Sequence, residues 1–252
     1  MQEEEILLKR KIEDLARRCY ETNQYLFTGF LSLSEQAVFH EMEQELSYVD
    51  HDLWGGPVGC ERKMIRFGSM DQLGYEEDYP VSCITVKPLM KKFAENLTHR
   101  DYLGALMHLG IERSVLGDII LREEAAYIIC TDKMAEYVAE NLDKIRHTSV
   151  YCTVTKDMPP ETMPVFLTQE LIVSSCRCDS IVAKAWQMSR NQSLALFRAK
   201  KIFVNGRQYE NNSGLLEEED IVSVRGFGKF IYDGVVQETK KGRVRVKIRK
   251  NA

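Results

Sequence analysis

The chain has 252 residues, of which 44% are hydrophobic and 29% are charged, and its formal net charge is −4. This composition supports roughly two or three compact domains and excludes a disordered or low-complexity chain. No apolar run approaches the roughly 20 residues that a membrane-spanning helix needs, and the amino-terminal segment has no apolar signal-peptide core, so we expect a cytoplasmic protein without a membrane partner.

Residues 1–76 are predicted to form a small helical, α+β unit closed by a few strands. Apolar residues at helical spacing indicate one helix over residues 3–19. A second apolar stripe over residues 35–46 follows Ser34, whose residue type commonly caps helices. A Gly-Gly-Pro segment ends this pattern, and residues 61–68 are typical of a short extended or hairpin segment.

Residues 77–158 are predicted to form a ferredoxin-like domain with the element order βαββαβ, an order that many RNA-binding domains share. The six elements are expected at residues 81–88, 98–110, 117–123, 125–131, 132–145 and 149–156. Residues 159–175 begin with a proline-rich segment and are predicted to be a linker.

The seven cysteines are scattered and odd in number, which is typical of reduced thiols and not of a disulfide framework. Cys176 and Cys178 form a C-x-C pair, but no second cysteine or histidine pair follows them. A structural zinc site usually takes four ligands in two closely spaced pairs. We therefore expect no metal, and the sequence indicates no cofactor.

Positive charge is concentrated in residues 176–252. This segment holds 16 Lys and Arg against 8 Asp and Glu, a balance of +8, whereas residues 1–175 hold 18 against 30, a balance of −12. A local excess of positive charge attracts phosphate backbones, so the segment is predicted to bind nucleic acid. The alternative is a soluble surface that happens to be rich in lysine.

The same segment carries signals for helices, a tight turn and a strand. Asp179 can cap a short helix, and Ser189 can cap a second helix that begins at Arg190. Asn205-Gly206 predicts a tight turn between two strands. Alternation near the carboxyl end predicts a strand with Arg243, Arg245, Lys247 and Arg249 on one face.

These landmarks resemble the S4 RNA-binding domain, in the order R-x-D, a helix opened by S-R, basic residues before a V-N-G turn, and D-x-I-x-V. The resemblance implies that residues 176–252 bind structured RNA through two helices and the adjoining loop, by phosphate contacts and shape more than by base identity. The RNA-binding residues that it implies are Arg177, Ser189, Arg190, Asn191, Arg198, Lys200, Lys201, Asn205, Arg225 and Lys229. Asp179 and Gly206 are expected to shape the fold instead.

Three further segments resemble signatures of the bacterial YlmH family. They are GGPVGCERKMIRF at 55–67, LTHRDYLGALMHLGIERSVLGDI at 97–119 and SVRGFGKF at 223–230. This resemblance implies an RNA-binding factor that docks on the rRNA of the large ribosomal subunit and on tRNA, including peptidyl-tRNA. It also implies a role in ribosome-associated quality control, where a stalled nascent chain receives a carboxyl-terminal tail. Nothing in the sequence requires more than one copy, so we expect a monomer.

A second RNA-binding patch has five candidates, which are Arg62, Arg66, His99, Arg100 and Arg113. The alternative for Arg62 and Arg66 is a solvated strand face. For residues 97–113, the alternative is a structural hinge in which Asp101 pairs with Arg100 or Arg113.

Two other classes of function remain open at this point. One is an RNA-modifying enzyme of the pseudouridine-synthase type, but the Arg-Leu-Asp setting of its catalytic aspartate is absent from the first 175 residues. His99-Arg100-Asp101 also differs from a kinase catalytic loop, because Leu106 stands where that loop has asparagine. The other class is an adaptor whose acidic part binds basic ribosomal proteins. We therefore predict a non-catalytic RNA-binding protein, with ribosomal proteins as a further class of partner.

Overall fold

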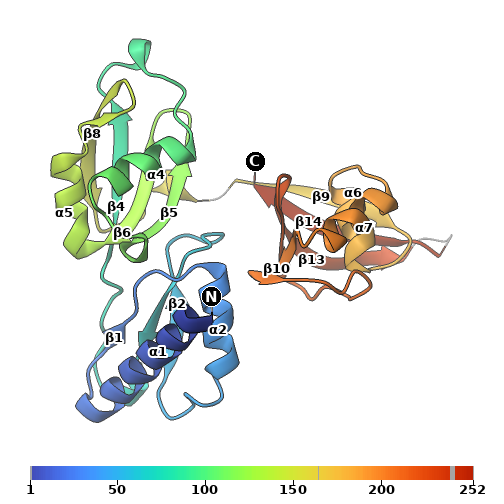
Figure 1. Cartoon of the computed structure of the whole chain (residues 1–252), viewed down its shortest axis with the longest axis horizontal. Helices are drawn as coiled ribbons and strands as arrows, with labels where there is room; N and C mark the ends of the chain where they lie inside the picture. The colour runs from blue at the N-terminus through green and yellow to red at the C-terminus, as the bar shows by residue number, and fades with distance from the viewer. Residues whose placement is uncertain (1, 164, 239–241, 252) are drawn as a thin grey trace. The chain divides into compact units, whose positions relative to one another are not determined.

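A computed structural model of the chain describes residues 2–163, 165–238 and 242–251 (Figure 1). The described residues form an α+β protein with several sheets, and the chain divides into two compact units, Met1–Met163 and Pro164–Ala252. The predicted boundary after residue 76 lies inside the first unit, between its two sheets. No helix of the described residues is long and apolar enough to cross a membrane.

The amino-terminal part of the first unit packs helices against a small antiparallel sheet. Helices α1 (Gln2–Thr22), α2 (Leu33–Met42) and α3 (Met70–Leu73) accompany strands β1 (Leu26–Phe27), β2 (His51–Trp54) and β3 (Met64–Phe67), in the sheet order β1-β3-β2. Ile12, Phe39 and Ile65 are fully buried in the core that α1, α2 and the sheet share. The cap of α2 is Ser32 and not Ser34, because Glu35 completes a capping box with Ser32.

The rest of the first unit has the expected order of strand, helix, two strands, helix and strand. These elements are β4 (Val81–Pro88), α4 (His99–His108), β5 (Leu116–Leu121), β6 (Ala126–Thr131), α5 (Asp132–Asn141) and β8 (Thr148–Thr155). Short elements lie between or after them: η1 (Lys91–Phe93), η2 (Arg113–Val115), β7 (Lys144–Ile145) and η3 (Pro160–Thr162). The sheet is antiparallel, with the order β5-β6-β4-β8-β7.

Both helices cover one face of this sheet, since Leu106 of α4 and Val138 of α5 share a core with Ile84 and Ile128. The predicted helix over residues 132–145 is shorter than expected, because α5 ends at Asn141 and β7 pairs with the start of β8.

The second unit packs two helices on an antiparallel sheet. Its elements are β9 (Phe166–Val173), α6 (Cys178–Ala185), α7 (Arg190–Arg198), β10 (Ile202–Val204), β11 (Arg207–Gln208), β12 (Ile221–Val224), β13 (Gly228–Glu238) and β14 (Val244–Asn251). The strand order is β11-β10-β12-β13-β14-β9. Helices α6 and α7 lie against the sheet (Figure 1). Ile181 of α6 and Phe197 of α7 are buried with Val222, Phe230 and Val246 of the sheet.

The prediction of a linker over residues 159–175 is wrong for much of its length. Residues 166–173 form β9, which pairs along its whole length with β14, from Phe166 opposite Asn251 to Val173 opposite Val244. The buried side chains of Leu171 and Val173 belong to the core of the second unit. The sheet therefore begins ten residues before the predicted start of the domain at residue 176. The proline-rich segment upstream of this strand led to the prediction of a linker.

Candidate nucleic-acid interface

A fully buried carboxylate organises the start of the two helices in the second unit. Arg177 is the N-cap of α6, so the prediction that Asp179 caps this helix is wrong, and Asp179 lies in the first turn with no exposed area. Its two oxygens accept from Nε and Nη2 of Arg177, both at 3.1 Å, and from Nε of Arg190 at 3.3 Å. Because a buried charge needs partners, this cluster fixes both arginines at the surface.

Helix α7 begins where the sequence predicts. The Ser189 hydroxyl accepts from the backbone N–H of Gln192, and the Gln192 side chain accepts from the backbone N–H of Ser189. Ser189 is therefore a helix cap, while Asn191 is exposed in the first turn. Ser193 ties the helix to α6 by donating from its buried hydroxyl to the carbonyl of Asp179 at 2.9 Å.

Three exposed cations lie at the other end of α7, and we call Arg198, Lys201 and Arg225 the basic edge. The backbone N–H of Arg225 donates to the carbonyl of Lys201 at 3.0 Å, which joins the β12–β13 turn to the end of α7. The Arg225 guanidinium lies 4.7 Å from the centre of the Phe203 ring, a cation–π contact. Within the described part of the chain, none of the three forms an ion pair with a carboxylate, so their charge is available to a polyanion.

Three other predicted RNA-binding residues already have partners in the fold. Lys200 lies 3.2 Å from a carboxylate oxygen of Glu210. Asn205 has φ of 50° in the tight turn with Gly206, as predicted, and its side-chain amide donates to Asp220 and accepts from the backbone N–H of Ile221. Lys229 is half-buried in β13. The Asn205 side chain thus holds two loops together.

The basic face predicted for the last strand is neutralised by neighbouring acids. Arg245 pairs with Glu170, Lys247 with Asp233, and Arg249 with both Asp233 and Glu219. Arg243 precedes β14, which begins at Val244, so it does not belong to the strand face as predicted. The strand therefore contributes little uncompensated charge, in contrast to the basic edge.

Arg62 is a buried structural residue, which contradicts its assignment to a second RNA-binding patch. Its Nε donates to the carbonyl of Leu116 at 2.7 Å, and its Nη2 donates to those of Phe30 at 2.7 Å and Arg113 at 2.9 Å. Only 9% of the residue is exposed. Burial lowers the pKa of the guanidinium, and the Arg113 charge lowers it further. Arg62 therefore joins the two sheets of the first unit and cannot reach RNA.

Replacing Arg62 with Met should destabilise the first unit by about 2–4 kcal/mol, because three carbonyls lose their donor while the volume is kept. Urea unfolding followed by tryptophan fluorescence measures this loss. The neighbouring Lys63→Met is the matched control and should change stability by less than about 1 kcal/mol. An RNA affinity that falls in folded Arg62→Met would restore Arg62 to the binding surface.

Arg66 is also committed to the fold. Its guanidinium pairs with Asp52 at 2.8 Å and lies over the rings of Tyr25 and Tyr79. It also donates to the carbonyl of Glu77 at 2.8 Å. Asp52, the two rings and the carbonyl compensate the charge of Arg66 within the fold. Arg66 therefore belongs neither to an RNA-binding patch nor to a solvated strand face.

The remaining candidates of the second patch surround the start of α4. His99 and Arg100 are exposed, whereas Arg113 is half-buried, and its Nη1 has no hydrogen-bond partner among the described residues. Partial burial lowers the pKa of His99, and the Arg113 charge adds to this effect. Asp101 accepts from Thr98 and pairs with Arg146 at 3.3 Å, so the alternative in which Asp101 pairs with Arg100 or Arg113 does not describe this segment.

Phe227 and Trp186 are not among the RNA-binding residues that the sequence predicts. The Phe227 ring is 50% exposed in the turn between β12 and β13, and its carbonyl accepts from the indole N–H of Trp186 at 3.1 Å. The available signal was a phenylalanine between two glycines in a basic segment, because glycines at such positions often mark a turn with an exposed tip.

The chain is similar to known proteins over most of its length. Residues 75–158 match the family model described as "Putative RNA-binding domain in YlmH". The chain is 30% identical over 221 residues to "Ribosome-associated protein quality control protein P2" of Bacillus subtilis (strain 168), a match that covers 87% of this chain and 84% of the relative. The chain belongs to the YlmH family.

A solved structure, "Cell division protein ylmH from Streptococcus pneumoniae", is also similar, with a TM-score of 0.49 and 19% identity. That match covers 60% of this chain and 91% of the solved one. The family model ends at residue 158, so it does not include the basic edge.

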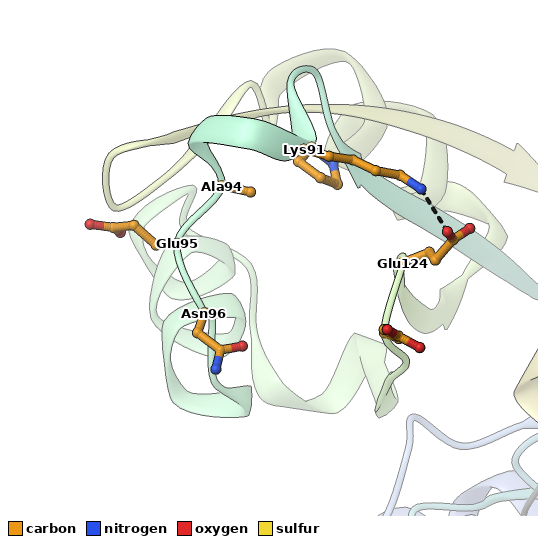
Figure 2. Close-up of a pocket in the computed structure, with 7 residues that line it drawn as sticks. Lys91, Ala94, Glu95, Asn96 and Glu124 are labelled. Carbon is orange, nitrogen blue, oxygen red and sulfur yellow. Dashed lines mark hydrogen bonds and ion pairs between the residues drawn. The ribbon is translucent and has the colours of Figure 1, made fainter.

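A surface cavity in this YlmH-family chain has an acidic lining. Its volume is about 340 Å³, and it is lined by Pro88, Lys91, Ala94, Glu95, Asn96, Glu123 and Glu124. Figure 2 shows Lys91 reaching towards Glu124, with its Nζ 2.6 Å from a carboxylate oxygen. Three glutamates against one paired lysine repel phosphate, so this cavity is unsuited to an RNA backbone.

The thiols of the chain are mostly buried. Burial raises the pKa of Cys83, Cys130 and Cys178 to about 12 and that of Cys152 to about 11. A protonated thiol is a poor nucleophile and a poor metal ligand. Among the residues that the structure describes, no three His, Cys, Asp or Glu side chains gather as a group that could hold a metal.

Proposed function

We propose that this chain is a non-catalytic RNA-binding factor that associates with the large ribosomal subunit and with tRNA in ribosome-associated quality control. The observation that carries the proposal is the basic edge, three exposed cations without ion pairs among the described residues, in a unit whose residues 164–252 hold 16 Lys and Arg against 9 Asp and Glu. The family membership and the name of the Bacillus subtilis relative support the ribosomal setting. A cytoplasmic location follows from that setting.

The domain assignments belong to the same proposal. The strand order β5-β6-β4-β8, together with the element order βαββαβ, supports a ferredoxin-like fold for residues 81–155. Two adjoining helices, the Ser189 cap and the tight turn at Asn205 support an S4 arrangement in the second unit. The resemblance of these segments to S4 domains suggests binding to the backbone of folded RNA.

The mechanism that we propose is positional. Arg177 and Arg190, held by Asp179, and the basic edge would contact phosphates and so fix the orientation of the chain on rRNA or tRNA. The first unit, with 18 Lys and Arg against 29 Asp and Glu in residues 1–163, would avoid phosphate and suit basic ribosomal proteins. No step in this mechanism requires a nucleophile, an acid or a base, so the chain would act as a monomeric binding factor.

A salt titration of RNA affinity tests this proposal. The full chain should bind tRNA and fragments of large-subunit rRNA with an affinity that falls steeply as salt rises, because each phosphate contact releases a counterion. Three to five such contacts predict a slope of about −3 to −5 in a plot of log affinity against log salt concentration. An affinity that does not respond to salt would reject binding through phosphates, and conversion of the RNA to a modified product would support the enzyme alternative.

A further inference from the structure

The turn between β12 and β13 presents an aromatic ring to solvent. Val224 pairs with Gly228, so Arg225, Gly226 and Phe227 form a three-residue loop. Gly226 and Gly228 have φ of 89° and 111°, which a residue with a side chain rarely adopts. A Cβ added at either glycine would meet no atom within 4 Å, so the space around the loop is open. The loop can therefore be approached closely by a ligand.

Both sides of this loop are fixed to the body of the second unit. On one side, the Trp186 indole donates to the Phe227 carbonyl, and the Trp186 ring also packs against Phe230 at a centroid distance of 5.4 Å. Lys250 lies over the Trp186 ring and donates to the carbonyl of Ala185. On the other side, Arg225 is joined to Lys201, as described for the basic edge. The exposed ring is thus held in place before any ligand arrives.

The Phe227 ring contacts the Trp186 ring and keeps an exposed surface. It meets Trp186 in an edge arrangement, with ring centroids 6.2 Å apart and planes at 62°. Half of the residue remains exposed, in the same three-residue loop as the exposed Arg225. Proteins hold single-stranded nucleic acid by combining cations for the phosphates with an exposed ring for a base, and this loop carries both an exposed ring and Arg225 of the basic edge.

We propose that Phe227 is a stacking site for one unpaired nucleobase, positioned by Trp186 and by the two flanking glycines. The inference rests on the proposed RNA-binding function and extends it. Phosphate contacts alone do not distinguish a duplex from a loop, whereas a stacked base must be free of its own helix. With Phe227 and the basic edge together, the chain should bind RNA that has an unpaired nucleotide beside a folded stem more tightly than a plain duplex.

The test compares two RNAs with equal numbers of phosphates, a hairpin with a single-stranded loop and a blunt duplex. Wild-type chain should prefer the hairpin. Phe227→Leu keeps an apolar side chain but removes the ring, and it should weaken hairpin binding about tenfold while changing duplex affinity less than twofold. Phe227→Trp, which keeps an aromatic face, should retain the preference. The salt dependence should be the same in all three proteins, because no phosphate contact is lost.

A hairpin whose loop bases are replaced by abasic sugars provides the decisive control. The abasic hairpin keeps every phosphate but offers no base to stack. Wild type should therefore bind it about as weakly as Phe227→Leu binds the intact hairpin. Phe227→Leu should bind the abasic and the intact hairpin with the same affinity. Equal hairpin affinity in wild type and Phe227→Leu would overturn the stacking site. Equal losses on hairpin and duplex, with a lower melting temperature, would also overturn it and make Phe227 a packing residue. If wild type binds neither RNA, the proposed RNA-binding function itself fails.

Discussion

Reversal of two charges on the basic edge, Arg198→Glu with Lys201→Glu, is expected to abolish association with the large ribosomal subunit. Both side chains are exposed, and neither has an ion pair in the described part of the chain, so the change removes two phosphate contacts and adds two repulsive charges. We expect RNA affinity near physiological salt to fall at least about a hundredfold, and the salt slope to become shallower by about 2. Filter binding over a range of salt concentrations measures both quantities.

The fold should tolerate this double reversal, because neither residue is tied to a buried acid. The matched control is Lys133→Glu with Lys144→Glu, which makes the same change in net charge at exposed positions of the first unit. The control should bind RNA within about threefold of wild type. A double variant that still binds with the wild-type salt slope would show that the basic edge is not the RNA-binding surface.

The choice of residues for this test depends on the structure. From the sequence, Arg190 and Lys201 are an equally reasonable pair to reverse. However, Arg190 donates to the fully buried carboxylate of Asp179, so a glutamate at residue 190 would place two carboxylates together and disturb the fold. A loss of binding in that variant could not be assigned to RNA contact.

Replacing Asp179 with Ala is expected to lower the free energy of unfolding of the second unit by about 3 kcal/mol. The carboxylate has no exposed area and receives three hydrogen bonds from two arginines, so its removal leaves their charges poorly compensated at the edge of the core. Urea unfolding followed by the fluorescence of Trp186 and Trp54 measures the change. The exposed Glu238→Ala should stay within about 0.5 kcal/mol of wild type.

The Asp179 variant also separates stability from binding. Arg177 and Arg190 remain cationic when Asp179 is removed, so folded Asp179→Ala should keep most of the wild-type salt slope and lose affinity only modestly. If Asp179→Ala unfolds at the same midpoint urea concentration as wild type, Asp179 does not have this structural role.

Local signals in the sequence predicted many of the elements. Residues 81–88 form β4 as predicted, because their β-branched side chains favour a strand whatever lies beside it. The Ser189 cap and the Asn205-Gly206 turn are likewise properties of a few neighbouring residues. These features depend on backbone preferences over short distances, which a single sequence contains.

The errors concern features that only long-range contacts decide. Residues 166–173 form strand β9 because they pair with residues 244–251. This partner is distant in the chain, so the local sequence near the prolines does not indicate it. Arg62 looks like a surface cation in sequence, but carbonyls of Phe30 and Leu116, distant in the chain, bury it. The charge excess of the sequence lies in the second unit. Which of its cations are neutralised, however, depends on the acids that the fold brings near them.

Co-sedimentation of the full chain with purified ribosomal subunits tests whether the basic edge binds the large subunit. We expect wild-type chain to sediment with large subunits and not with small subunits. The variant Arg198→Glu with Lys201→Glu should stay at the top of the gradient, and the Lys133→Glu with Lys144→Glu control should sediment like wild type. Wild-type chain that remains free of both subunits, or a basic-edge variant that still sediments with the large subunit, would contradict this expectation.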